Sequence, residues 1–134
     1  MKKILTLIVI SFMFISNEII AQNLKYYTTD FSVKIKYDDG SWSNWSDWED
    51  SHCLVNINLD REEINIYSPT PQEFTIYKYE EDSIYDNDGG EQIKLFCVDK
   101  DGLRCTIRLR IYENTLQLYV DYNDVVYVYN LIEK

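Results

Sequence analysis

The feature that most constrains the fold is a regular alternation of apolar and polar residues in the C-terminal part of the chain. Three consecutive runs, 103–112, 115–122 and 125–132, alternate with a period of two and are separated by short polar turns. A period of two is typical of half-buried strands, because successive side chains point to opposite faces of a sheet. The pattern predicts an antiparallel sheet with one buried face.

Turn lengths predict which residues face each other in this sheet. Two-residue turns at Glu113-Asn114 and Asn123-Asp124 set these pairs opposite one another: Ile111–Leu116, Leu109–Leu118, Ile107–Val120, Val120–Tyr127, Leu118–Tyr129 and Leu116–Leu131. A slip by one residue would turn the whole apolar set outward, so the agreement of three runs favours this register. A three-residue loop ending at Gly102 extends the same face to the run 92–99.

The rest of the chain repeats this organisation, with its glycines and prolines in turn positions. The predicted strands cover 25–37, 41–48, 53–59, 63–68, 73–80, 92–99, 103–112, 115–122 and 125–132. We expect an all-β fold, an antiparallel up-and-down meander of about eight to nine strands closed into a small lipocalin-like barrel that hides its strand edges. A two-sheet β-sandwich is the alternative.

Two hairpins in the N-terminal half affect which side chains are internal. A four-residue loop over 60–63 would set Leu59 opposite Ile64 and bury a second apolar patch. The first hairpin allows two registers. A two-residue turn at 39–40 would place Trp42 and Trp48 inside, whereas a three-residue loop over 38–40 would place Trp45 inside instead.

Residues 1–21 have the pattern of a secretory signal peptide. Lys2 and Lys3 precede an apolar run, and Ala21 offers a small residue for cleavage. The run is shorter than the roughly 20 apolar residues that a membrane-spanning helix needs. We therefore expect a single mature β domain over 22–134, with no stable membrane span after cleavage.

The mature domain would be strongly acidic. Removing Lys2, Lys3 and Glu18 from the chain leaves 11 basic and 22 acidic residues, a net charge of −11 over 113 residues. Such a charge repels nucleic acid and attracts basic partners. The charge thus favours a basic protein among the expected partners, which also include a small molecule or a glycan.

Cys97 and Cys105 fall opposite each other on the inner face of the predicted hairpin. Cross-strand partners lie within the Cα separation that a disulfide allows, and export to an oxidising compartment favours the bond. The sequence therefore predicts a disulfide between them, with two buried thiols as the alternative.

Aromatic residues supply the candidate binding groups. Trp42, Trp45 and Trp48 are spaced by three, which suits an extended segment whose rings can interleave with cations from arginine side chains. Arg108 and Tyr119 should lie side by side on the outer face. Tyr127 and Tyr129 should point inward, where their hydroxyls need polar partners or line a ligand cavity.

Groups suited to catalysis are scarce. His52 is the one histidine, and its neighbour Cys53 should point to the opposite face, so they do not form a nucleophile–base pair. The acidic run Asp86-Asn87-Asp88 departs from the calcium-loop pattern and reads as a solvated turn. We predict no catalytic residue, no metal site and no cofactor.

Several segments together resemble small secreted β-proteins of gut Bacteroidales. They are the export signal, the tryptophan run 42–48, Ile64-Asn65-Ile66-Tyr67-Ser68-Pro69, and the hairpin 97–105 followed by Ile107-Arg108. The resemblance implies export from a Gram-negative cell, to the periplasm or the medium, and a compact β fold. It carries over no activity and no catalytic residue.

These observations leave three hypotheses for function. The first is a non-catalytic binding protein for a small molecule or a glycan, taken by the barrel interior or the tryptophan segment. The second is an acidic periplasmic inhibitor of a basic enzyme such as lysozyme, with association accelerated by charge. The third, least favoured, is a hydrolase that uses its acidic loops.

Overall fold

The computed structural model describes residues 23–80 and 82–134, and this part of the chain contains strands and turns but no helix. The all-β prediction is confirmed. The strands are β1 (Asn23–Ile35), β2 (Glu49–Asp50), β3 (Leu54–Asn58), β4 (Glu63–Ile66), β5 (Gln72–Tyr79), β6 (Ile84–Tyr85), β7 (Glu91–Asp99), β8 (Arg104–Tyr112), β9 (Thr115–Asp121) and β10 (Val125–Glu133). The predicted signal peptide, 1–21, lies outside the described residues. Within the described ranges no helix is long and apolar enough to span a membrane.

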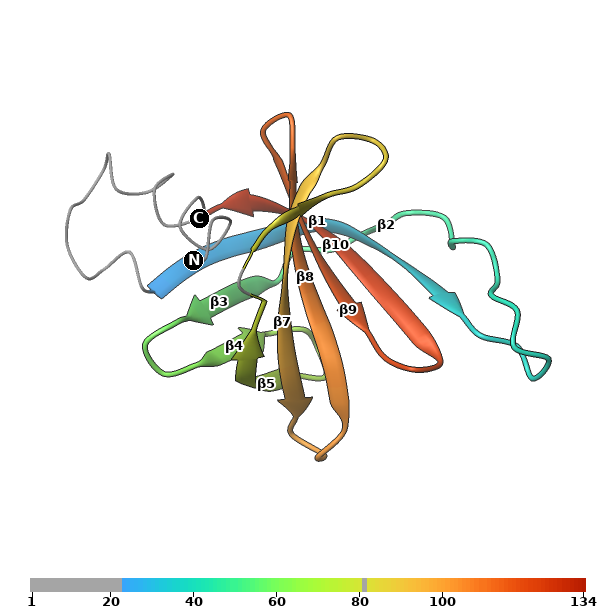
Figure 1. Ribbon diagram of the computed structural model, residues 1–134. Coiled ribbons are helices and arrows are strands. Elements are labelled where there is room, and N and C mark those ends of the chain that lie inside the picture. The colour runs from blue at the N-terminus through green and yellow to red at the C-terminus, as the bar shows by residue number, and fades with distance from the viewer. Residues whose placement is uncertain (1–22, 81) are drawn as a thin grey trace.

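Eight of the strands form a closed antiparallel up-and-down barrel (Figure 1). They follow the order β1-β3-β4-β5-β7-β8-β9-β10, and β10 pairs with β1 to close the sheet. The short strands β2 and β6 add to β1 and β7. Closure pairs the edges that an open sheet would expose. The predicted lipocalin-like barrel is therefore confirmed, and the sandwich alternative is excluded.

The predicted register of the C-terminal half is also confirmed. β8 and β9 pair Ile107 with Val120, and β9 and β10 pair Leu118 with Tyr129. The turn residues Glu113 and Asn114 both have positive φ, 50° and 74°, as a tight two-residue hairpin with the right-handed twist of its strands requires. The apolar set therefore faces inward.

The hairpin between β3 and β4 corrects the expected register. Ile57 lies opposite Ile64, so the connection spans 59–62 instead of 60–63. Glu62 adopts a left-handed φ of 58° and donates its N–H to the Leu59 carbonyl, which starts the turn one residue early. The difference shifts the pairing by two residues, and the same side chains remain buried because the strand period is two.

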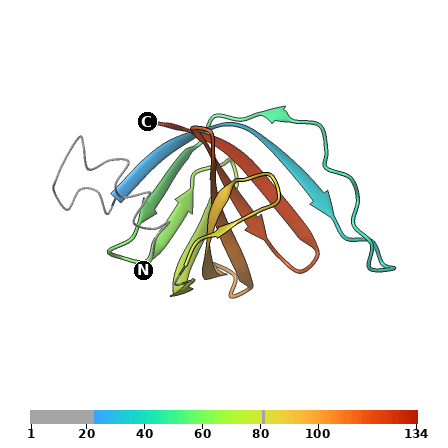
Figure 2. The same ribbon diagram turned by 45° about the horizontal axis from the view of Figure 1, so that its top comes forward.

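The predicted strand 41–48 does not form a regular strand. Gly40 has a φ of 91° and closes a three-residue loop, in which Tyr37 donates its N–H to the Ser41 carbonyl. In Figures 1 and 2 the end of β1 and the segment that follows it project away from the barrel. All three tryptophans are exposed, at 38%, 41% and 49% for Trp42, Trp45 and Trp48, so neither expected inward placement is found.

Cys97 and Cys105 pair across the β7–β8 hairpin as predicted, but the disulfide is not present and both are free thiols. The Cys97 Sγ lies 3.5 Å from the Leu95 carbonyl, to which it donates. Burial raises the pKa of Cys97 to about 12 and that of Cys105 to about 11. The two groups therefore pack as neutral thiols in the core.

Candidate functional site

The structure separates the seven candidate binding residues into two places. The tryptophans lie with Arg108 and Tyr119 on the outer surface, whereas Tyr127 and Tyr129 face inward on β10. In an up-and-down barrel alternate connections share an end. The connections β1–β3, β4–β5, β7–β8 and β9–β10 meet at one end, here called the pocket end, and the other three meet at the opposite end.

The segment 41–48, here called the Trp segment, runs beside β1 in an irregular extended conformation. Ser43 and Ser46 donate their N–H groups to the carbonyls of Ile35 and Val33. Their hydroxyls accept from the N–H groups of the same two residues, at 2.9 and 3.0 Å. Three residues of the Trp segment therefore span the same length as two residues of β1, since Ser43 pairs with Ile35 and Ser46 pairs with Val33. Each step from one tryptophan to the next thus advances about 6.7 Å along the strand.

This spacing leaves room for a side chain between successive rings, and a lysine fills it. The Lys34 ammonium lies 5.4 Å from the Trp42 ring centroid and 4.8 Å from the Trp45 ring centroid. We call the resulting row the cation–aromatic ladder. Its members in order are Lys36, Trp42, Lys34, Trp45, Tyr119 and Arg108.

The far end of the ladder confirms the predicted neighbours on the outer face. Arg108 and Tyr119 are register partners, and the guanidinium lies 4.1 Å from the tyrosine ring centroid. Trp45 meets Tyr119 edge-on, with ring centroids 6.2 Å apart. The cations next to the tryptophans are Lys34 on β1 and Lys36 just after it, however, and not the arginines expected from the sequence. Trp48 makes no ring or cation–π contact with any described residue.

The ladder covers an apolar strip on the outer face of β10. Val126 and Val128 are only 6% and 3% exposed, although they point away from the internal core. β10 lies between β1 and β9, so the contact between Trp45 and Tyr119 has to pass over its outer face. Trp42 and Trp45 thus attach the projecting segment to the barrel wall.

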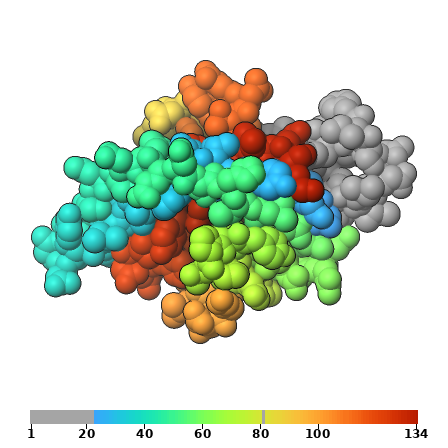
Figure 3. Space-filling view, turned by 180° about the vertical axis from the view of Figure 1, so that it is seen from behind, coloured from blue at the N-terminus to red at the C-terminus, as the bar shows by residue number. Residues whose placement is uncertain are grey.

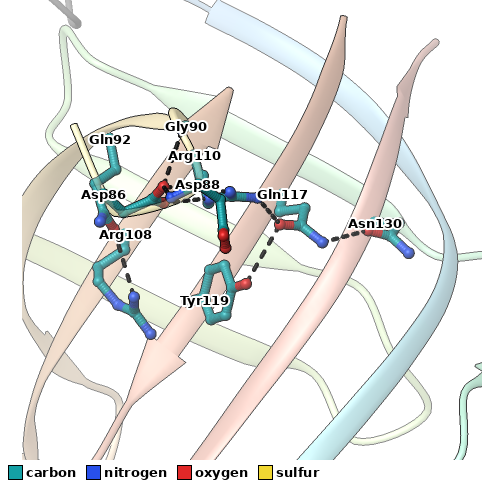
Figure 4. A network of polar contacts seen from close by, with 9 residues as sticks. All are labelled: Asp86, Asp88, Gly90, Gln92, Arg108, Arg110, Gln117, Tyr119 and Asn130. Atoms are coloured by element: carbon teal, nitrogen blue, oxygen red, sulfur yellow. Dashed lines mark hydrogen bonds and ion pairs between the residues drawn. The ribbon is translucent and has the colours of Figure 1, made fainter. Parts of the chain in front are cut away.

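A polar network occupies the neighbouring part of the outer face (Figure 4). Arg110 forms an ion pair with Asp86 at 2.5 Å and donates to Gln117 at 3.1 Å. Gln117 in turn donates to Asn130 at 2.9 Å, and Asn130 donates to Asp30. Asp30 lies on β1, so the network links the β5–β7 connection to β8, β9, β10 and β1.

Asp86 organises the polar connection that precedes β7. Its carboxylate accepts from the guanidinium of Arg110 and from the N–H groups of Asp88 and Gly90, and these hydrogen bonds lower its pKa to about 2. A Cβ on Gly90 would lie 2.5 Å from the Arg110 guanidinium, so a larger residue there would have to displace the guanidinium from its present position in the ion pair. The acidic run therefore forms a braced turn. Residues 23–80 and 82–134 contain no group of three or more side chains placed to hold a metal ion.

A pocket of about 310 Å³ opens at the pocket end of the barrel. Its lining comes from residues 70–74, 99–103 and 122–127, which lie far apart in sequence. In Figure 3 the lime, orange and red-orange spheres of these three segments adjoin on one face. We call this cavity the mouth pocket.

The wall of the mouth pocket combines aromatic and aliphatic side chains. Phe74 is buried, Tyr122 and Tyr127 are half-buried, and Leu103 is 58% exposed. Tyr127 therefore lines the pocket, which is one of the two alternatives that the sequence left open for the inward tyrosines. Tyr129 lies one inward position deeper on the same strand and belongs to the core, where its hydroxyl accepts a hydrogen bond from Gln72 at 2.9 Å. The two tyrosines do not line a common cavity.

Hydrogen bonds hold the β7–β8 loop in position at the pocket. One oxygen of Asp99 accepts the N–H groups of Asp101 and Leu103, both at 2.9 Å, and the other accepts the Tyr122 hydroxyl at 2.7 Å. Burial opposes ionisation of Asp99, but these hydrogen bonds outweigh it and lower the pKa of the carboxyl. The pKa of Tyr122 is raised by burial and by the same hydrogen bond. The loop is thus fixed before any ligand arrives.

The rim of the mouth pocket carries an excess of negative charge. Glu73, Asp101 and Asp124 line it, are exposed, and make no side-chain hydrogen bond or ion pair with any described residue. Lys100 is the single basic residue in the lining. Sequence reasoning missed this grouping because Glu73 lies near the start of β5 and the two aspartates lie in two separate turns, far apart in the sequence.

Comparisons of the chain with protein-family models, with curated proteins and with solved structures find no match. The geometry of the chain itself therefore carries the assignment of function.

Proposed function

We propose that this chain is an exported, non-catalytic binding protein and that the mouth pocket binds a small molecule. The observation that carries the proposal is a cavity of about 310 Å³, bounded by three loops, at the mouth of a closed barrel. Ligand sites in β-barrels are found at this position, and their volumes begin at about 300 Å³. The core below the pocket holds the loops rigid, which lowers the entropic cost of binding.

The tryptophans are less suited to stacking on a ligand such as a glycan. Two of the three have cations or rings against them in the ladder, so their faces are engaged within the protein. Ligand stacking on Trp42 or Trp45 would have to displace Lys34 and uncover the apolar strip on β10. The mouth pocket requires no such rearrangement.

A thermal-shift screen of a small-molecule panel, followed by calorimetric titration of hits, tests this proposal. Leu103→Ser removes an exposed apolar side chain from the pocket wall and should weaken binding about fivefold or more, given ~1 kcal/mol for the area it contributes. Ile132→Ser is the matched control, because that residue is similarly exposed, at 52% against 58%, and lies at the opposite end of the barrel. If a ligand binds Leu103→Ser as tightly as the unaltered protein and also quenches tryptophan fluorescence, its binding site lies on the outer face, at the tryptophans, and not in the mouth pocket.

A second candidate function, a factor that binds and inhibits a basic protein, is favoured by the charge of the same end. Exposed acidic residues lie there, among them Asp38, Asp39, Asp101 and Asp124 on its connections and Glu73 near the start of β5. A charged surface of this kind accelerates association with a partner of opposite charge. Inhibition of lysozyme in 20 mM salt that weakens in 300 mM salt supports this function, and absence of inhibition at low salt argues against it.

A further inference from the structure

We infer that the mouth pocket takes an organic cation, meaning an amine or quaternary ammonium group carried on an apolar body. The inference rests on the proposed function and names the chemical class of its ligand. Three properties of the pocket support it: the unneutralised charge of the rim, the aromatic character of the wall, and the contrast with the charged groups elsewhere on the barrel.

The rim charges are available to a ligand because the protein does not neutralise them. The carboxylates of Glu73, Asp101 and Asp124 have no side-chain partner among the described residues, whereas that of Asp99 is saturated by three hydrogen bonds. Only Lys100 opposes them. Glu73, Asp101 and Asp124 against Lys100 leave two negative charges in excess at the exposed rim, and the hydrogen-bonded but ionised Asp99 adds a third. The net charge of −10 for the whole chain adds a long-range attraction for cations.

The wall supplies surfaces that suit the body of such a ligand. Phe74, Tyr122 and Tyr127 bring three aromatic rings to a pocket that also contains Leu103 and Val125. Aromatic rings attract ammonium groups through their quadrupole and pack against apolar groups through dispersion. A ligand with an ammonium group at the rim and an apolar body in the pocket uses both parts of the site.

The outer face of the barrel shows the opposite arrangement, which makes the rim distinctive. Arg108 and Arg110 are each paired with a carboxylate, and each lies over a tyrosine ring. The protein thus neutralises these two arginine side chains with its own carboxylates, whereas Arg104 lies over the Tyr77 ring without an ion pair to a described residue. At the mouth pocket aromatic rings and carboxylates are present, and the one lysine of the lining, Lys100, makes no ion pair and no cation–π contact with a described residue.

The magnitude of the charge preference follows from Coulomb's law. A carboxylate about 6 Å from an ammonium group contributes about threefold in affinity at the dielectric constant of water. Two excess negative charges therefore favour a cation about tenfold over a neutral compound of the same shape. They disfavour an anion by a similar factor. Added salt should weaken this preference, because the screening length is about 8–10 Å at physiological ionic strength and becomes shorter as the salt concentration rises.

The test uses three probes with one aromatic body and different charges: phenethylammonium, phenethyl alcohol and phenylpropionate. Affinities are measured by calorimetric titration at 20 mM and 500 mM sodium chloride, with the full mature chain. The rim variant carries Glu73→Gln, Asp101→Asn and Asp124→Asn. The control variant has the same net charge and neutralises three exposed acids in connections at the opposite end: Asp60→Asn, Asp82→Asn and Glu113→Gln.

We expect phenethylammonium to bind about tenfold more tightly than the alcohol, and the rim variant to lose this preference while the control variant keeps most of it. Equal or tighter binding of the alcohol or the anion, lost in Leu103→Ser, would overturn the cation assignment and leave the pocket as a binding site. The proposed function itself would be overturned if no probe and no compound of the wider panel binds with an affinity that Leu103→Ser lowers. A cation preference unchanged in the rim variant would also overturn the inference.

Discussion

Replacing Trp45 by alanine should destabilise the protein more than replacing Trp48, although the two residues have the same chemistry and similar exposure. Their exposed fractions are 41% and 49%, so the loss of buried apolar area is nearly the same in the two variants and cancels in the comparison. The remaining difference is the ladder, because Trp45 contacts the Lys34 ammonium and the Tyr119 ring, whereas Trp48 makes no such contact with a described residue.

The two contacts set the size of the expected difference. A cation–π contact at an exposed site contributes about 0.5–1 kcal/mol, and an edge-to-face ring pair contributes about 0.5–1.5 kcal/mol beyond burial. We therefore expect Trp45→Ala to lower the free energy of unfolding by about 1–2.5 kcal/mol more than Trp48→Ala. The loss includes uncovering of the outer valines on β10, which would raise the value towards the upper limit.

Urea denaturation followed by far-ultraviolet circular dichroism measures both variants, since this signal does not depend on which tryptophan remains. A double-mutant cycle with Lys34→Met separates the ion–ring term, which we expect to be about 0.5–1 kcal/mol with Trp45 and near zero with Trp48. Equal losses in the two alanine variants, or a coupling of Lys34 to Trp48 as large as that to Trp45, would refute the ladder as the element that attaches the Trp segment.

Three further predictions concern the barrel wall and core. Arg110→Met should raise the pKa of Asp86 from about 2 towards its ordinary value near 3.8, as measured by carbon-detected nuclear magnetic resonance; an unchanged pKa would show that the turn N–H groups suffice. Because the pKa of Asp86 is lowered in the folded state, its contribution to stability is present above about pH 4 and is lost as the pH falls towards 2. Arg110→Met should therefore lose less stability than the unaltered protein between pH 4 and pH 2. Cys97 and Cys105, with pKa values of about 12 and 11, should resist Ellman's reagent at pH 8 in the folded protein and react after denaturation; rapid reaction in the native state would contradict their burial. Ile107→Ala should cost about 2–5 kcal/mol in the free energy of unfolding, since this fully buried side chain is at the centre of β8, and a cost below 1 kcal/mol would contradict the inward face assigned to it.

The barrel was accessible from the sequence because its information is local and repeated. Each hairpin joins strands that are adjacent in the chain, so turn length and period-two alternation together fix the register, as for Cys97 and Cys105. The β3–β4 hairpin differs by two residues because a non-glycine residue, Glu62, adopts the left-handed conformation that ends its turn and lets β4 begin at Glu63. Composition rules do not anticipate that choice.

The Trp segment was not accessible in the same way. Its spacing of three suggested rings interleaved with cations, and that pattern is present, but the cations come from Lys34 on β1 and Lys36 just after it. The sequence pattern alone does not distinguish arginine from lysine side chains as the cations between the rings. Which of them lie between the rings depends on the match of three residues in the segment to two in the strand, a property of the paired backbones.

The sequence by itself determined the class of fold, the inward face of each C-terminal strand and the strong negative charge, because each follows from local periodicity or composition. Only the tertiary structure decided that Cys97 and Cys105 remain thiols, that Tyr127 reaches a pocket while Tyr129 is buried, and that three carboxylates from segments far apart in the sequence share one rim. Closure of the barrel is the physical reason. It brings alternate turns to a common end, and no single stretch of sequence contains the distances between them.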